Sequence, residues 1–209
     1  MTGNYDGRYE EEQTVDISYV AGGGTSRMEV PPDTGRRIFV LFALGSLVSV
    51  LLGVYGGLHE PQLVSINVAG FSGPQAVKAW LTTLAFVLAL VQLWSALVMW
   101  GRMPGMRTAP SWIGGLHRWS GRLAVLATVP VAVHCLYALG FQHSDGRVLA
   151  HSLIGCLFYG AFVVKMLALS RPGTPKWTLP VVGGVVFTLL TGLWITASLW
   201  FFTTAGLKF

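Results

Sequence analysis

Five long apolar runs follow a polar N-terminal segment in this chain of 209 residues. The runs cover approximately residues 36–58, 78–101, 116–139, 148–169 and 179–205. Each reaches the roughly 20 residues that a helix needs to cross a ~30 Å hydrocarbon core. None shows the alternation of a membrane β-strand, and a helix satisfies its own backbone hydrogen bonds in lipid. The pattern therefore predicts an all-α protein, a bundle of five transmembrane helices over residues 36–209.

Residues 1–35 have a different character from the rest of the chain. They contain the runs EEE, GGG and PP and show no apolar periodicity. Their acidic and polar start also differs from a signal peptide, which has a basic segment followed by an apolar one. Such a segment cannot bury enough apolar surface to fold, so residues 1–35 are predicted to form a disordered cytoplasmic tail.

Composition and charge support a membrane location. Hydrophobic residues make up 53% of the chain and charged residues only 11%, whereas soluble domains average about a quarter charged residues. Only Glu60 and Asp145 are acidic after residue 33, so the net charge of +5 hides a slightly acidic tail and a strongly basic remainder. In a membrane protein this excess belongs near lipid headgroups. The lipid bilayer is therefore the expected partner, and nucleic acid is not.

The basic residues also predict an orientation. With the N-terminus in the cytoplasm, three basic residues fall outside, Lys78, Arg147 and Lys208. Nine fall at inner ends or inner loops: Arg36, Arg37, Arg102, Arg107, Arg118, Arg122, Lys165, Arg171 and Lys176. This positive-inside bias favours a multi-pass protein of the cell membrane with its C-terminus outside.

Small residues mark expected helix contacts. In the first run, Gly45 with Ser49 and Gly53 with Gly57 repeat at a spacing of four, the pattern that lets two helices approach closely. Packing within the chain is favoured over a dedicated dimer motif. Three later glycines would either leave room for a flat macrocycle or, as we favour, pack tightly: Gly121, Gly155 and Gly160.

Histidine carries the candidate chemistry. No Asp or Glu lies in the middle of a span, which argues against a proton-coupled transporter or pump. His134 lies one to two turns before the end of the third run, and His151 lies about one turn into the fourth. Because a short loop joins these antiparallel runs, both imidazoles are expected at similar depth near the outer face. Two such imidazoles can ligate one heme iron from opposite sides, in a site built from facing helices.

Other interpretations of these residues stay open. Either histidine could lie at a wet interface and bind a carbonyl or a headgroup. Cys135 and Cys156 form neither a CxxC pair nor a disulfide framework. They could supply thiolates to copper or zinc, but buried cysteine as a small apolar residue is favoured.

A resemblance extends the prediction to the inner face. The stretch LHRWSGRLAVL resembles the HRW-x-G-R-L-A stretch of ferric-reductase-type components, which belong to the membrane b-type cytochromes. There, two histidines of one helix face two stacked hemes. The resemblance implies His117 as an inner ligand and His134 as an outer one. The longer pattern that ends at HSLIGCLFYGAFVVKM is also similar to a family of small bacterial five-span membrane proteins of unassigned function.

The chain departs from the reductase pattern in ways that limit the resemblance. His117 and His134 are seventeen residues apart, against about fourteen in the reductases, so at about 100° per residue they lie about 100° apart around the helix. No lower histidine in the fourth or fifth run could pair with His117. Nothing with a Rossmann glycine fingerprint follows the fifth run, so the chain has no nicotinamide or flavin domain. At most, it is the membrane subunit of an oxidoreductase.

Together these observations predict a membrane electron-transfer protein. One heme b, with a second as an alternative, is expected near the outer face. His134 and His151 would be its metal ligands. His117 would be a second-site ligand or a propionate contact, and Arg118 and Arg122 would contact propionates or lipid phosphates. Quinol or an exported iron–sulfur protein would exchange electrons with it. The alternative is a non-redox assembly subunit or small-molecule channel without a cofactor.

Overall fold

The structure, a computed structural model, contains helices and no strands over the residues that it describes, which are 34–62, 67, 70–106 and 108–209. Five helical spans are long and apolar enough to cross a membrane. In chain order the elements are α1 (Thr34–Leu58), α2 (Pro74–Met99), α3 (Ile113–Val133), η2 (His134–Leu139), α4 (Gly146–Ser170), α5 (Thr178–Leu193), η3 (Trp194–Leu199) and α6 (Trp200–Ala205). The segments η2 and η3 are π-helical turns that continue α3 and α5, so α3 with η2 forms the third span, and α5, η3 and α6 form the fifth.

The five predicted spans are confirmed, most of them within a few residues at each end. The largest difference is at the start of α2, which begins at Pro74 rather than at residue 78. Proline is well suited to the first helical turn because the amide hydrogen that it lacks would have no partner there. α1 begins at Thr34, so the last two residues of the predicted tail are helical. Residues 1–33 lie outside the described part of the chain, and the prediction of disorder there stays a prediction.

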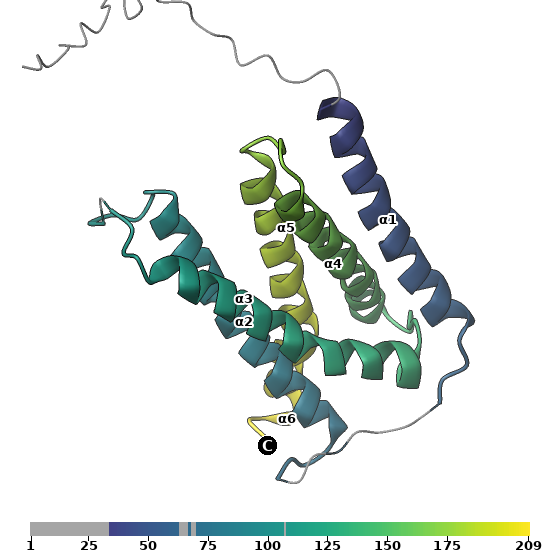
Figure 1. The fold of residues 1–209 in the computed structure, drawn as a ribbon. Coiled ribbons are helices and arrows are strands. Elements are labelled where there is room, and N and C mark those ends of the chain that lie inside the picture. The colour runs from purple at the N-terminus through teal and green to yellow at the C-terminus, as the bar shows by residue number, and fades with distance from the viewer. Residues whose placement is uncertain (1–33, 63–66, 68–69, 107) are drawn as a thin grey trace, which may run out of the picture. The chain divides into compact units, whose positions relative to one another are not determined.

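The third span changes direction part-way along its length (Figure 1). Pro130 lies inside α3, and the π-helical turn η2 begins four residues later at His134. Proline removes one backbone hydrogen bond and clashes with the preceding turn, which bends a helix. The wider π-turn that follows Pro130 then sets the direction of the side chains after it.

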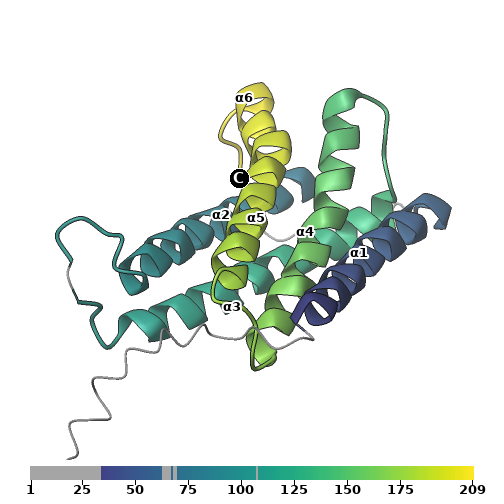
Figure 2. The same ribbon diagram turned by 90° about the horizontal axis from the view of Figure 1, so that it is seen from above.

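The spans pack in an order that differs from their order in the chain. α1 packs on α4, and α4 packs on α5. Both α5 and η3 pack on α2, and α2 packs on α3. The turn η2 at the end of the third span contacts α1. In Figures 1 and 2, α2 and α3 form one pair, and α1, α4 and α5 lie beside it. In the described part of the chain, α3 and α4 make no extensive backbone contact although a short loop joins them. The third and fourth spans therefore face each other across the interior of the bundle.

The contact between α1 and α4 depends on two glycines. A Cβ atom added to Gly160 would overlap the hydroxyl of Ser49 and the backbone oxygen of Gly45. A Cβ atom added to Gly45 would lie 2.7 Å from the backbone oxygen of Gly160. The Gly45 and Ser49 pair therefore does pack within the chain, as predicted, and Gly160 is its partner rather than space for a macrocycle. No neighbouring atom lies within 4 Å of a Cβ at Gly57, so the second pair of small residues is not used in the same way.

The two ends of the bundle are named here by the termini of α1. The Thr34 end holds the α2–α3 and α4–α5 connections, and the Leu58 end holds the α1–α2 and η2–α4 connections. At the Leu58 end the ring of His59 stacks between those of Tyr55 and Tyr137, with centroids 5.0 Å away on both sides. Its Nε2 atom donates to the Tyr137 carbonyl at 3.1 Å. His59 thus joins α1 to the third span and is a structural histidine.

Candidate functional site

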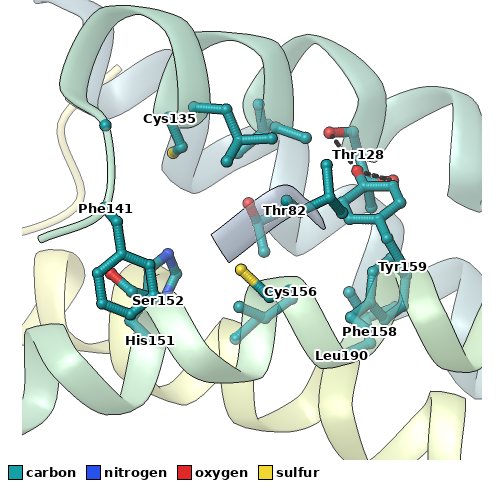
Figure 3. A pocket seen from close by; sticks show the side chains of 17 residues that line it. Thr82, Thr128, Cys135, Phe141, His151, Ser152, Cys156, Phe158, Tyr159 and Leu190 are labelled. Atoms are coloured by element: carbon teal, nitrogen blue, oxygen red, sulfur yellow. Dashed lines mark hydrogen bonds between the residues drawn. The ribbon is translucent and has the colours of Figure 1, made fainter. Parts of the chain in front are cut away.

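A cavity of about 100 Å³ lies inside the bundle toward the Leu58 end. All five spans contribute to its wall, which is mostly apolar. Its polar lining residues are Thr82, Thr128, Cys135, His151, Ser152, Cys156 and Tyr159. Figure 3 shows these side chains directed into the space between the third span and α4. The Tyr159 hydroxyl links the two sides, 3.2 Å from the carbonyl of Thr128 and 3.1 Å from its hydroxyl.

His151 lines this cavity with one ring nitrogen already engaged. Its Nδ1 atom lies 2.8 Å from the Thr196 hydroxyl on η3, and that hydroxyl donates its single hydrogen to the Gly192 carbonyl at 2.7 Å. With that hydrogen on the Gly192 carbonyl, the hydroxyl oxygen accepts from Nδ1–H, and the lone pair of the neutral ring lies on Nε2. No partner for Nε2 is found among the described residues. A metal-ligating histidine has this arrangement, with the far nitrogen held by a hydrogen bond and the near one free.

His134 is at the predicted depth but not in the same cavity. It lies five residues before Leu139, the end of its span, and His151 lies five residues after Gly146, the start of its own. The side chain of His134 is buried, at 7% exposure, and it begins the π-helical turn η2. However, it does not contribute to the cavity wall that His151 lines. The structure thus brings the two histidines to one end of the bundle without placing them face to face.

His117 repeats the arrangement of His151 at the Thr34 end. Its Nδ1 atom lies 2.8 Å from the Ser95 hydroxyl on α2, and that hydroxyl donates to the Val91 carbonyl at 2.7 Å. By the same reasoning Nδ1 carries the hydrogen and Nε2 the lone pair. The Gln92 side chain donates to the His117 carbonyl and, at 2.8 Å, to the Ser120 hydroxyl, so this turn of α3 is held closely against α2.

Arg118 and Arg122 lie on the outside of the bundle. Both side chains are exposed, and the guanidinium of Arg122 stands over the ring of Trp119, 5.1 Å from its centroid. Neither residue contributes to the wall of the cavity beside His151. In the described structure, their position suits contacts to headgroup phosphates, and it separates them from the candidate site at the Leu58 end.

The two cysteines share the cavity with His151. In Figure 3 the sulfur atoms of Cys135, from the third span, and Cys156, from α4, point toward the same space. Both are free thiols. Among the described residues, no group of three or more His, Cys, Asp and Glu side chains is arranged to hold a metal ion. The described residues therefore do not by themselves support a zinc or copper site, whereas a heme iron needs only two ligands from the protein.

Sequence reasoning missed the polar residues that surround the histidines. Thr196, whose hydroxyl contacts His151, also accepts a hydrogen bond of 2.8 Å from Arg147 through its backbone carbonyl. The Arg147 guanidinium also lies 3.9 Å from the ring centroid of Trp200. Isolated polar residues inside apolar spans were the available signal, because such residues are costly in lipid and are usually buried against partners.

Both π-helical turns adjoin this site. η2 carries His134 and Cys135, and η3 carries Thr196. A π-turn widens the helix by one residue and shifts the side chains after it around the axis, and such turns are frequent at functional sites. Periodicity at 3.6 residues per turn assigns these side chains to other faces. The sequence pattern therefore could not predict which of them meet.

The residues have the chemistry to bind a heme iron, but the cavity is too small to hold a heme. His151 offers a free Nε2 atom in a largely apolar interior. The cavity of about 100 Å³ is smaller than the roughly 300–1,000 Å³ of typical ligand pockets. A macrocycle would therefore require the third span to separate further from α4. The two spans make no extensive backbone contact, and the hydrogen bond between Tyr159 and Thr128 is a link that such a movement would break.

One known protein family matches nearly the whole of the bundle. A family model matches residues 38–209 of the chain, which include all five spans except the first turn of α1. The chain belongs to a family of unknown function, DUF6529. Neither the curated proteins nor the solved structures contain a match. Membership of DUF6529 agrees with the predicted resemblance to a five-span family of unassigned function.

The contact between Thr196 and His151 in this DUF6529 protein leads to a direct test. Replacing Thr196 with valine keeps the shape of the side chain but removes the acceptor for Nδ1–H. We expect the free energy of unfolding to fall by about 1 kcal/mol. If a metal group is bound, its affinity should fall by about 10- to 100-fold. Thr196→Ser keeps the hydroxyl and should remain close to wild type in both measurements, so equal losses in the two variants would contradict the assigned hydrogen bond.

Proposed function

We propose that this protein is an integral membrane electron-transfer protein that binds b-type heme near the Leu58 end of its bundle. His151 and His134 would be the two residues that hold the heme iron. The observation that carries the proposal is the His151 imidazole, whose Nδ1 is held by Thr196 while its Nε2 is free at a cavity between the third and fourth spans. A bound heme would supply one-electron transfer, and the protein would supply the ligands and the apolar surroundings.

Two further features of the chain support this proposal. His117 has the same hydrogen-bonded arrangement at the opposite end, which suits a second-site ligand or a propionate contact. The stretch of the third span that begins at His117 also resembles the HRW-x-G-R-L-A stretch of ferric-reductase-type components. Arg118 and Arg122, exposed one turn apart, would bind propionates or lipid phosphates. One heme is proposed, with a second at His117 as the alternative.

The positions of the basic residues give the proposal its orientation. The N-terminus would be cytoplasmic and the C-terminus outside, so the site of His134 and His151 would lie near the outer face of the cell membrane. Its electron partner would be quinol in the membrane or an exported iron–sulfur protein. In this arrangement the chain would act as the membrane subunit of an oxidoreductase.

One observation favours a second candidate function. The cavity is small and mostly apolar as the spans are packed here, which suits a cofactor-free assembly subunit or small-molecule channel. In that case the anchored histidines would stabilise helix contacts by their hydrogen bonds to Ser95 and Thr196. The two candidates differ in whether the purified protein is coloured.

An absorption spectrum of the purified full-length protein tests the proposal. Membranes from cells grown with a heme precursor should yield a preparation with a Soret band, a reduced α band after dithionite addition, and a pyridine hemochrome typical of heme b. A heme-to-protein ratio near one supports a single site, and a ratio near two supports the alternative with His117. A colourless preparation that also fails to bind added hemin would contradict the proposal and support the cofactor-free function.

A further inference from the structure

A second, larger cavity lies at the Thr34 end of the bundle, whereas the cavity beside His151 lies toward the Leu58 end. Its volume is about 450 Å³, within the roughly 300–1,000 Å³ of typical ligand pockets. The first turns of α1 form one wall, and the connection between α4 and α5 forms the other. Three arginines lie in these walls: Arg36, Arg37 and Arg171. The cavity thus gathers three permanent positive charges from two segments that are distant in sequence.

Nothing acidic in the described part of the chain balances these charges. Glu60 and Asp145 are its only acidic residues, and both belong to the Leu58 end. Asp145 there caps α4 by accepting from the Val148 amide at 2.9 Å and lies 4.0 Å from Arg147. Guanidinium groups carry five donors in a planar fork, which matches the oxygen atoms of a phosphate. The N-terminus of α1 adds the positive end of a helix dipole at the same place.

The connection between α4 and α5 lies against Arg37. Gly173 has a φ of +81°, a conformation that residues with a side chain rarely adopt. A Cβ atom there would lie 3.4 Å from Nη1 of Arg37, so this guanidinium lies directly beside the glycine. Thr174 holds the same turn, because its hydroxyl lies 3.1 Å from the Ala168 carbonyl and 2.9 Å from that of Arg171.

The remaining walls of this cavity are apolar. Ile38, Val40 and Leu41 come from α1, and Pro172 and Pro175 come from the connection. Since α1 and α4 both span the membrane, their ends meet at the depth of the headgroups. A ligand with a phosphate at one end and hydrocarbon at the other would satisfy both kinds of wall. Basic pockets between membrane helices bind anionic lipid headgroups in this way.

We propose that this arginine cavity binds the phosphate of an anionic phospholipid. Arg37 and Arg171, one from each wall, hold the phosphate oxygens, and Arg36 contributes the third charge. The acyl chains run along the apolar face of α1 toward the bilayer. The proposal is independent of the heme site, since the two cavities share no lining residue.

Native mass spectrometry of the full-length protein in a mild detergent tests this binding. The probes are phosphatidylglycerol and phosphatidylcholine at equal concentration. Wild type should retain phosphatidylglycerol preferentially, and Arg37→Gln with Arg171→Gln should weaken that binding by roughly 30-fold, given about 1 kcal/mol for each arginine near a membrane surface. The matched control, Arg102→Gln with Lys208→Gln, removes the same charge from exposed positions outside the cavity and should bind as wild type does.

Two further measurements keep the proposal falsifiable. Arg37→Lys with Arg171→Lys keeps both charges, so it should fold and bind phosphatidylglycerol better than the glutamine pair does. In lipid-depleted detergent, millimolar inorganic phosphate should raise the thermal midpoint of wild type only if a free phosphate is the natural source. No preference for phosphatidylglycerol, with or without a response to phosphate, or an equal loss of binding in the control pair, would overturn the proposal.

Discussion

Replacing Gly160 with alanine is expected to destabilise the bundle by about 3 kcal/mol, although it adds a single carbon atom. That carbon would overlap the Ser49 hydroxyl and the backbone oxygen of Gly45. A side chain can rotate away, but a backbone oxygen moves only if α1 as a whole moves away from α4. Lipid offers no hydrophobic drive between helices, so close packing carries much of their association. Unfolding by SDS titration from detergent micelles measures the change.

Gly184→Ala provides the matched control in the same measurement. Gly184 is also inside a helix, but a Cβ atom there meets no atom within 4 Å. Alanine has a higher helix propensity than glycine by about 1 kcal/mol, so this variant should be as stable as wild type or slightly more stable. If Gly160→Ala were equally stable, α1 and α4 would not approach each other as the structure shows.

Replacing His151 with alanine should remove most of the proposed heme. This substitution deletes the ligand with the free Nε2 atom, and the loss should exceed the 10- to 100-fold effect of removing a supporting group, which leaves roughly a tenth of the heme or less. His134→Ala should also abolish or shift the Soret band. Absorbance per mole of purified protein measures both effects, and size-exclusion profiles show whether each variant is folded.

His143→Ala and His59→Ala are the controls for the ligand assignment. His143 is exposed in the loop between η2 and α4, so its removal should leave the spectrum unchanged. His59 stacks between two tyrosines and binds the Tyr137 carbonyl, so its loss should reduce stability without changing the spectrum. A wild-type spectrum in both His134→Ala and His151→Ala would refute the assignment of these two ligands. Other residues would then have to bind the heme.

The spans were predictable because they depend on local chain properties. About 20 successive apolar residues must satisfy their own backbone in lipid, and that requirement gives the helices and their approximate ends without knowledge of their neighbours. The start of α2 was placed late because the apolar run begins at Lys78, whereas Pro74 already suits the first turn. Even the Gly45 and Ser49 pair was visible as a packing face, although its partner Gly160 was not.

The candidate site was predictable in part. The matched depth of His134 and His151 was predicted by counting residues on both sides of a short loop, and in the structure each lies five residues from the end of its span. Their directions do not follow from counting, because Pro130 and the π-turn η2 change the side-chain register before His134. The hydrogen-bond partners Ser95 and Thr196 come from other spans and could be recognised only from the folded chain.

The sequence alone thus determined an all-α bundle of five spans and the gathering of basic residues at span ends. The tertiary structure decided which faces meet: α1 on α4 rather than on α2, a cavity between the third span and α4, and three arginines around a second cavity. The physical reason is that lipid solvates every apolar face of a helix almost equally. Hydrophobicity therefore places a helix in the membrane, but only packing and hydrogen bonds between spans select its neighbours.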